Sequence, residues 1–200
     1  MFINFIRIVV FYLLCIHGSQ SQSTQLPITC LFARPGAGKT TVANAVIELL
    51  GGECVGLDLD ECVTSDMKSN FAKGIYPNRS EREAFMESAC DFLQRFIEKK
   101  VTETPTCKNL LVSFSFVNDD LRDVFRKRFP SSRWVLLNVG TETASERIAH
   151  RKGHFYNGIP IVSSSLCLRF YPLNVISYFT RNNKVVSRKI KRIQNGNSIL

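Results

Sequence analysis

The stretch LFARPGAGKTTVANA, residues 31–45, joins an apolar run to a helix-like run through a loop rich in glycine. From Ala33 to Thr40 it reads AxxxxGKT, the pattern of a phosphate-binding loop with alanine in place of the usual first glycine. Such a loop needs a strand before it and a helix after it. Ile28–Phe32 is apolar and favours a strand, and residues 40–50 carry apolar side chains at helical spacing. The loop and its flanks therefore predict an α/β fold.

The residue types in the loop suit the binding of a nucleotide. Gly36 and Gly38 allow the backbone to curl its N–H groups around a phosphate, at the start of a helix whose dipole favours an anion. Lys39 would reach the outer phosphates, and Thr40 would be a ligand of Mg²⁺. We therefore expect ATP and Mg²⁺ as cofactors, with nucleotide contacts from Ala33, Arg34, Pro35, Gly36, Ala37, Gly38, Lys39, Thr40 and Thr41.

The positive charge of the chain is confined to its last quarter. The 200 residues carry a formal charge of +9, but residues 1–146 hold 16 Lys and Arg against 17 Asp and Glu, whereas residues 147–200 hold ten basic residues and no acid. Three of these ten, Arg147, Arg151 and Lys152, stand close together where they could neutralise the phosphates of a nucleotide. Because the basic residues are not interleaved with aromatic ones along a groove, we expect no nucleic acid partner.

Seven cysteines without a Cys-x-x-Cys spacing predict reduced, mostly buried thiols rather than a disulfide framework or a zinc site. Residues 1–23 differ from the rest, because one arginine, nine apolar residues at 8–16 and a Ser/Gln stretch together resemble a secretory signal peptide. Nine apolar residues are too few to span a bilayer.

Three interpretations of this N-terminal segment stay open: a true signal, an organellar or membrane-directing extension, and a translation start placed upstream of the domain. In each of them, residues 1–25 lie outside the catalytic fold. We expect the catalytic domain to be cytoplasmic, and membrane association only if the N-terminal segment is retained.

Strands and helices alternate beyond the loop, which predicts a parallel sheet covered on both faces. Further strands are expected at residues 54–59, 110–116 and 134–139. One helix should begin with a capping box from Ser80 to Glu83 and bury Phe85, Ala89, Phe92, Phe96 and Ile97. Another should run from Asp119 to before Pro130, and a third should be capped by Thr143 and Glu146. Asp58 and Asp60 end the second strand, which places them in one cleft with the loop.

Four separated stretches resemble, in order, the gluconokinases, which belong with the shikimate kinases among the small P-loop kinases. LDECV (residues 59–63) stands at the family's Gly-Asp-x-Leu-His segment and matches at Asp60. GIYPNRSER (74–82) resembles Gly-x-Pro-Leu-x-Asp-x-Asp-Arg, and LRDVFR (121–126) resembles Tyr-Arg-Asp-x-Leu-Arg. ERIAHRKGHF (146–155) is similar to the family's lid, Glu-Arg-x-x-x-Arg-x-Gly-His-Phe, and is the most specific match.

This resemblance implies a P-loop kinase domain over residues 26–158, with a three-layer fold, a parallel sheet flanked by helices and a short lid. It implies the transfer of phosphate from ATP to a small sugar acid, namely gluconate giving 6-phosphogluconate. Asp60 would orient the acceptor hydroxyl, and Arg82 and Arg122 would bind its carboxylate. Arg147 and Arg151, one helical turn apart, would join Lys39 and Asp60 in catalysis by stabilising the transferring group.

Several alternatives stay open. The Asp58-x-Asp60 pair also resembles the shikimate kinase pattern, so a shikimate-type or other small-molecule P-loop kinase remains an alternative, as does a nucleotide-binding protein without kinase activity. Residues 159–200 are basic and atypical. They contain a predicted strand at 170–178 and a predicted amphipathic helix with Val185, Val186, Ile190 and Ile193, and they are either a diverged last strand and helix or a non-native tail. The oligomeric state is not fixed by the sequence, and a homodimer is among the alternatives.

Overall fold

The structure is a computed structural model that describes residues 26–150, 175–181 and 184–189. The signal-like segment, Arg151 and the rest of the predicted lid lie outside the described residues. The elements follow one another as β1 (Ile28–Phe32), α2 (Lys39–Leu50), η2 (Gly51–Glu53), β2 (Cys54–Asp58), η3 (Leu59–Cys62), α3 (Ser65–Ala72), α4 (Arg79–Glu103), β3 (Asn109–Phe114), α5 (Asp119–Arg128), β4 (Arg133–Asn138), α6 (Thr141–Ala149), β5 (Val175–Arg181) and β6 (Lys184–Lys189).

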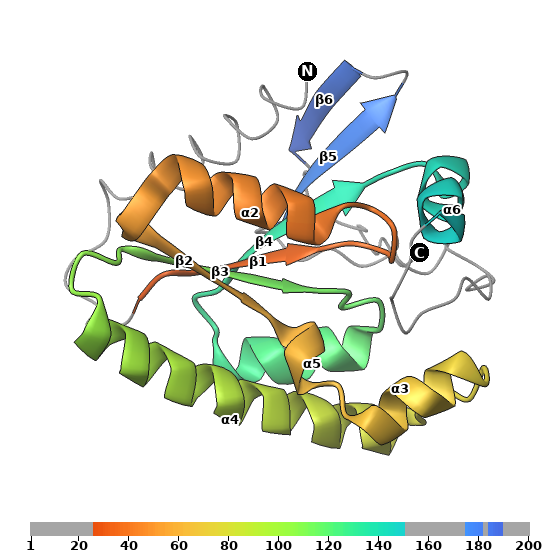
Figure 1. Ribbon diagram of the computed structural model, residues 1–200, viewed down its shortest axis with the longest axis horizontal. Helices are drawn as coiled ribbons and strands as arrows, with labels where there is room; N and C mark the ends of the chain where they lie inside the picture. The colour runs from red at the N-terminus through yellow and green to blue at the C-terminus, as the bar shows by residue number, and fades with distance from the viewer. Residues whose placement is uncertain (1–25, 151–174, 182–183, 190–200) are drawn as a thin grey trace, which may run out of the picture.

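The described strands form one sheet in the order β2-β3-β1-β4-β5-β6 (Figure 1). Strands β1 to β5 pair in parallel, and β6 pairs with β5 in the antiparallel sense. Cys30 in the central strand β1 lies beside Val112 of β3 and Trp134 of β4. The predicted parallel sheet is confirmed, and its carboxyl ends bring the β1–α2 loop next to the ends of β2 and β3.

The C-terminal segment differs from the prediction. The expected strand at 170–178 is observed at Val175–Arg181, and the amphipathic helix expected from Val185 is wrong, because Lys184–Lys189 forms the edge strand β6. The two valines favour a strand through their branched side chains, and the residues that completed the helical spacing, Ile190 and Ile193, lie outside the described residues.

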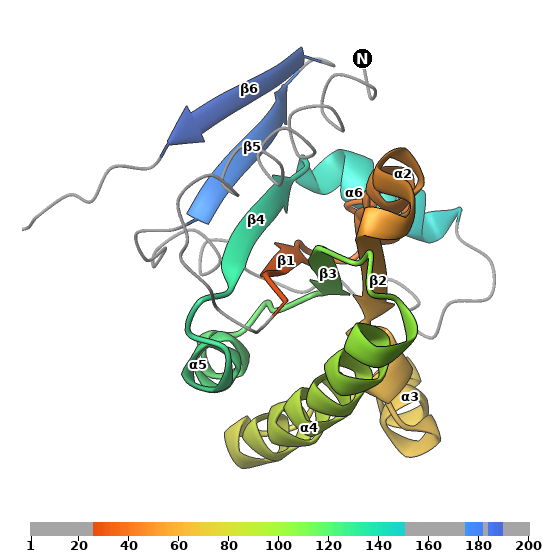
Figure 2. The same cartoon turned by 90° about the vertical axis from the view of Figure 1, so that its left-hand side faces the viewer.

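Helices cover both faces of the sheet, as predicted (Figure 2). Helix α2 lies on one face, where Val42, Ala43 and Val46 pack against Leu31 and Val135. Helices α4 and α5 lie on the other, over a second core that takes in the buried side of α4: Met86, Ala89, Cys90, Leu93 and Ile97. Of the five residues predicted to be buried on α4, the two smaller ones are buried, and Phe85, Phe92 and Phe96 are half-buried at the edge of this core.

Strand β3 ends at Phe114, two residues before its predicted end, because the backbone turns at Phe116. Phe116 has a φ of 42°, a conformation that a bulky residue rarely adopts. Its ring is fully buried and packs edge-on against Phe125 and Trp134, with ring centroids 5.2 and 4.9 Å apart. This aromatic packing offsets the backbone strain and fixes the loop that leads from β3 to α5.

Both predicted helix caps are wrong in position. The capping box of α4 is formed by Asn78 and Glu81: the Asn78 side chain accepts from the Glu81 N–H (3.0 Å), and the Glu81 carboxylate accepts from the Asn78 N–H (2.7 Å). The capping box, and with it the start of α4, lies two residues earlier than predicted, which leaves Glu83 to pair with Arg79. Helix α6 begins at Thr141 after Gly140, so the residues predicted to cap it, Thr143 and Glu146, lie inside it.

The five described cysteines are free thiols, four of them buried, as predicted for this part of the chain. Burial raises the pKa of Cys54 and of Cys90 to about 12, so both thiols are neutral at physiological pH. Within the described ranges, no helix combines the length and the apolar character needed to cross a membrane.

Candidate active site

The phosphate loop follows β1 and depends on two glycines with positive φ. Gly36 has a φ of 78° and Gly38 a φ of 89°. A Cβ at Gly36 would lie 2.4 Å from the carbonyl oxygen of Ala144 in α6, so a larger residue has no room there. Gly38 is the N-cap of α2, and no side chain of the described residues caps this helix end. The N-terminus of α2 therefore faces the loop as a site for an anion.

Lys39 crosses from the loop to the end of the neighbouring strand. The residue is only 9% exposed, and its ammonium group donates to the carbonyl of Ala33 and to the hydroxyl of Ser115, both at 3.3 Å. Ser115 directly follows β3 and was not predicted as a site residue. Its position at the carboxyl end of a strand beside the loop strand was the available signal.

Thr40 and the end of β2 meet as the sequence predicted. The Thr40 hydroxyl donates to one carboxylate oxygen of Asp58 at 3.2 Å, and the other oxygen accepts from the Asp60 N–H at 3.1 Å. Asp58 thus contacts the proposed magnesium ligand directly. The hydroxyl and the carboxylate are oxygen donors of the kind that Mg²⁺ prefers.

A magnesium ion at this position would need further oxygens. No group of three or more His, Cys, Asp and Glu residues in the described part of the chain is placed to hold a metal. Mg²⁺ is usually held by one or two protein oxygens together with phosphates and water.

Helix α6 lies against the phosphate loop through two arginines. A Cβ at Gly38 would lie 3.8 Å from Nη1 of Arg147, so this exposed guanidinium is beside the loop. Arg34, from the loop, donates to the hydroxyl of Thr141 at 2.7 Å. The first contact brings the start of the predicted lid beside the loop, and the second holds the first residue of α6 there. The second predicted lid arginine, Arg151, lies outside the described residues.

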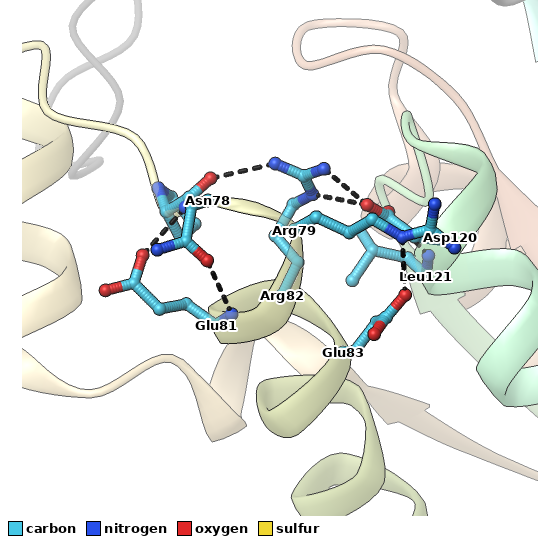
Figure 3. Close-up of polar contacts among 8 residues, drawn as sticks. Asn78, Arg79, Glu81, Arg82, Glu83, Asp120 and Leu121 are labelled. Atoms are coloured by element: carbon cyan, nitrogen blue, oxygen red, sulfur yellow. Dashed lines mark hydrogen bonds and ion pairs between the residues drawn. The ribbon is translucent and has the colours of Figure 1, made fainter.

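Arg82 joins the first turn of α4 to the first turn of α5 (Figure 3). Its Nε donates to Oδ2 of Asp120 at 2.9 Å, its Nη2 donates to the same oxygen, and its Nη1 donates to the carbonyl of Pro77 at 2.8 Å. Burial disfavours the charged form of Asp120, but the hydrogen bonds from Arg82 and from the Leu121 N–H outweigh it, so the pKa of this carboxyl lies below its usual value.

Arg122, predicted to bind the acceptor carboxylate, is buried in the structure. Its side chain is only 3% exposed, and its guanidinium donates to the carbonyl of Phe116 and to the carboxylate of Asp119. It therefore holds the β3–α5 loop from inside and does not present its charge to the cleft. Arg126, one turn further on, stacks 4.6 Å above the ring of Trp134.

Comparison with known proteins adds a sequence relative and two solved structures. No family model matches the chain. A protein of Dictyostelium discoideum described as "Probable gluconokinase" is 29% identical over 140 residues, which are 69% of this chain and 68% of that protein. A sugar kinase from Janibacter sp. HTCC2649 superimposes with a TM-score of 0.61 at 19% identity, over 76% of this chain and 85% of its own. A gluconokinase from Sinorhizobium meliloti 1021 superimposes with a TM-score of 0.53 at 19% identity, over 78% of this chain and 83% of its own.

The strand order, the phosphate loop and these structures define the fold as that of a P-loop kinase, as predicted. Within that class, the sequence relative confirms the resemblance to the gluconokinases. All three of these proteins are described as kinases or gluconokinases.

Proposed function

We propose that the protein is an ATP-dependent kinase of a small sugar acid, and that gluconate, giving 6-phosphogluconate, is its substrate. The single observation that carries this proposal is the contact of Thr40 with Asp58, next to Lys39, at the carboxyl ends of the strands. The loop alone binds phosphate, whereas a loop with a carboxylate against its threonine provides the oxygen donors for a metal-bound nucleotide. The resemblance to the gluconokinases supports the acid as acceptor.

ATP would bind to residues 33–41, with its phosphates at the N-terminus of α2. Thr40 and Asp58 would hold Mg²⁺, which supplies charge neutralisation on the phosphates when bound. Lys39 lies buried where it can contact the outer phosphates, and Arg147 lies beside Gly38 where it can neutralise the transferring group. The predicted contribution of Arg151 stays a prediction.

The acceptor would lie between the end of β2 and the first turn of α4. Asp60 begins the segment after β2 and would orient the attacking hydroxyl. Arg82, on the first turn of α4, is 25% exposed and would bind the carboxylate of the acid. Arg122, which the sequence placed beside it, would act on the β3–α5 loop instead, because its side chain is buried against Phe116 and Asp119.

An ADP-release assay on the full chain tests the proposal, with gluconate, shikimate and the neutral polyol glucitol as acceptors. We expect gluconate to give the highest kcat/KM. A preference for shikimate would move the assignment to a shikimate-type kinase. ATP binding without release of ADP on any acceptor would support a nucleotide-binding protein without kinase activity, an alternative favoured by the burial of Arg122.

A further inference from the structure

Asp120 is a buried carboxylate that the sequence matches leave without a role. It lies on the first turn of α5, its side chain is 7% exposed, and one of its oxygens accepts from the Leu121 N–H at 2.8 Å. The other oxygen receives two N–H groups of Arg82. An acid at a helix N-terminus is favourable by itself, but this one is also directed across to a different helix.

The contacts of Arg82 are confined to part of its guanidinium (Figure 3). A guanidinium has five N–H donors in a fixed plane. Asp120 takes one from Nε and one from Nη2, and the carbonyl of Pro77 takes one from Nη1. None of the described residues takes the remaining N–H on Nη1 and on Nη2. The two terminal nitrogens can therefore each still donate to one oxygen of a carboxylate.

We propose that Asp120 is a positioning residue for the acceptor: it fixes the plane of the Arg82 guanidinium so that the remaining donors receive the carboxylate of the sugar acid. This inference rests on the proposed function. A long arginine side chain would otherwise lose rotamer freedom when the acid binds, and that cost would weaken the affinity. Asp120 orders the side chain in advance, with Pro77 holding the other nitrogen.

The Arg79–Glu83 pair is a natural control for this arrangement. It lies on the same turn of α4, with Nε of Arg79 2.7 Å from the Glu83 carboxylate, but both side chains are exposed and both belong to one helix. Loss of that pair removes a carboxylate of the same kind without releasing Arg82.

The test is steady-state kinetics of the full chain with ATP and gluconate, together with the melting temperature of each variant. For Asp120→Asn we expect the KM for gluconate to rise about tenfold, with kcat and the KM for ATP changed less than about threefold. Asp120→Glu keeps the charge and should recover part of the loss. Arg82→Lys should raise the same KM, and the Asp120→Asn, Arg82→Lys double variant should be no worse than Arg82→Lys alone, because both changes act through one contact. Glu83→Gln should behave as the wild type.

Two results would overturn the inference, and they can be told apart. If the wild type phosphorylates gluconate and both Asp120 variants only lower the melting temperature, with the KM for gluconate unchanged, Asp120 is a structural clamp and the inference alone fails. If the wild type transfers phosphate to no acid, the proposed function fails and the inference fails with it.

Discussion

The two sides of the proposed cleft differ in how their side chains are used. On the nucleotide side, Lys39 and Thr40 contact groups at the ends of β3 and β2, Ser115 and Asp58, so the contacts converge on the phosphate loop. On the acceptor side, Arg82 contacts Asp120 of the neighbouring helix and the carbonyl of Pro77. Arg122 contacts Asp119 of its own helix and the carbonyl of Phe116. A sequence motif thus specifies where a charged residue stands, and tertiary packing decides what it contacts.

The reason for the difference is the range over which each site is assembled. The phosphate loop is one contiguous segment whose shape follows from glycines and a helix start, which are local properties. The acceptor side is assembled from the α3–α4 linker, α4 and α5, which are far apart in the sequence. Its geometry therefore depends on packing between elements, and the partner of Arg82, Asp120, is not visible in any one motif.

The strongest test of the nucleotide side is the replacement of Lys39 by alanine. We expect kcat to fall by about a thousandfold or more, because the ammonium group acts on phosphates and not on the core, and the fold should survive. ADP release measures the activity, and circular dichroism measures the fold. Lys108→Ala, which removes an exposed ion pair with Glu53, should leave both unchanged. Undiminished turnover without Lys39 would end the interpretation of this segment as a phosphate loop.

Arg147 tests whether α6 belongs to the same site. Its guanidinium lies beside Gly38, so Arg147→Ala should lower kcat about a hundredfold with a smaller effect on the KM for ATP. Arg147→Lys should recover activity only partly, since an ammonium group cannot pair with two oxygens of the transferring group at once. Glu146→Gln, at the neighbouring exposed position, is the control. Loss of thermal stability at full kcat would make Arg147 a surface residue without a catalytic part.

Strands and the loop could be predicted well because their signals are short in range. Strand β1 was predicted with its observed bounds, Ile28–Phe32, because a short apolar run before a glycine-rich loop favours a buried strand. The capping residues were missed because Asn78 and Ser80 are both good caps, and only the actual start of α4 selects between them. The end of β3 was missed because burial of the Phe116 ring holds a backbone conformation that the residue type disfavours.

The candidate site could be predicted in composition but not in pairing. The sequence predicted that Asp58 and the phosphate loop share one cleft, because both lie at the carboxyl ends of parallel strands. The contact of Thr40 with Asp58 agrees with this prediction. Ser115, which contacts Lys39, belongs to no motif. Asp120 contacts Arg82 only because α5 packs against α4, which no local pattern predicts. Strand β6 shows the same limit at the C-terminus, where pairing with β5 decides the structure of a segment whose spacing also fits a helix.

Asp58 provides a further test of the nucleotide side, namely of its binding of Mg²⁺. If it holds Mg²⁺ together with the Thr40 hydroxyl, Asp58→Asn should raise the Mg²⁺ concentration for half-maximal activity about tenfold or more. The measurement is a Mg²⁺ titration of ADP release at saturating ATP. Glu61→Gln removes a nearby exposed acid and should leave the titration unchanged. An equal shift in both variants would mean that only the local charge matters.

The smallest effect is expected in the pH dependence of stability, and it compares the two ion pairs on the first turn of α4. The pKa of Asp120 is lowered in the folded protein, so its stabilisation is present above the ordinary aspartate value of about 3.9 and is lost as the pH falls through the lower folded value. Asp120→Asn should therefore lower the melting temperature by about 5 °C near pH 7, and this difference from the wild type should shrink below about pH 4. Glu83→Gln breaks an exposed pair within the helix and should leave the melting temperature unchanged, because water and salt screen that interaction. Thermal unfolding followed by circular dichroism from pH 3 to 7 measures both variants. If the melting temperature of Asp120→Asn stayed below that of the wild type by the same amount over this range, the loss would come from packing of the side chain. The buried and the exposed pair would then differ in packing and not in the strength of their charge interaction.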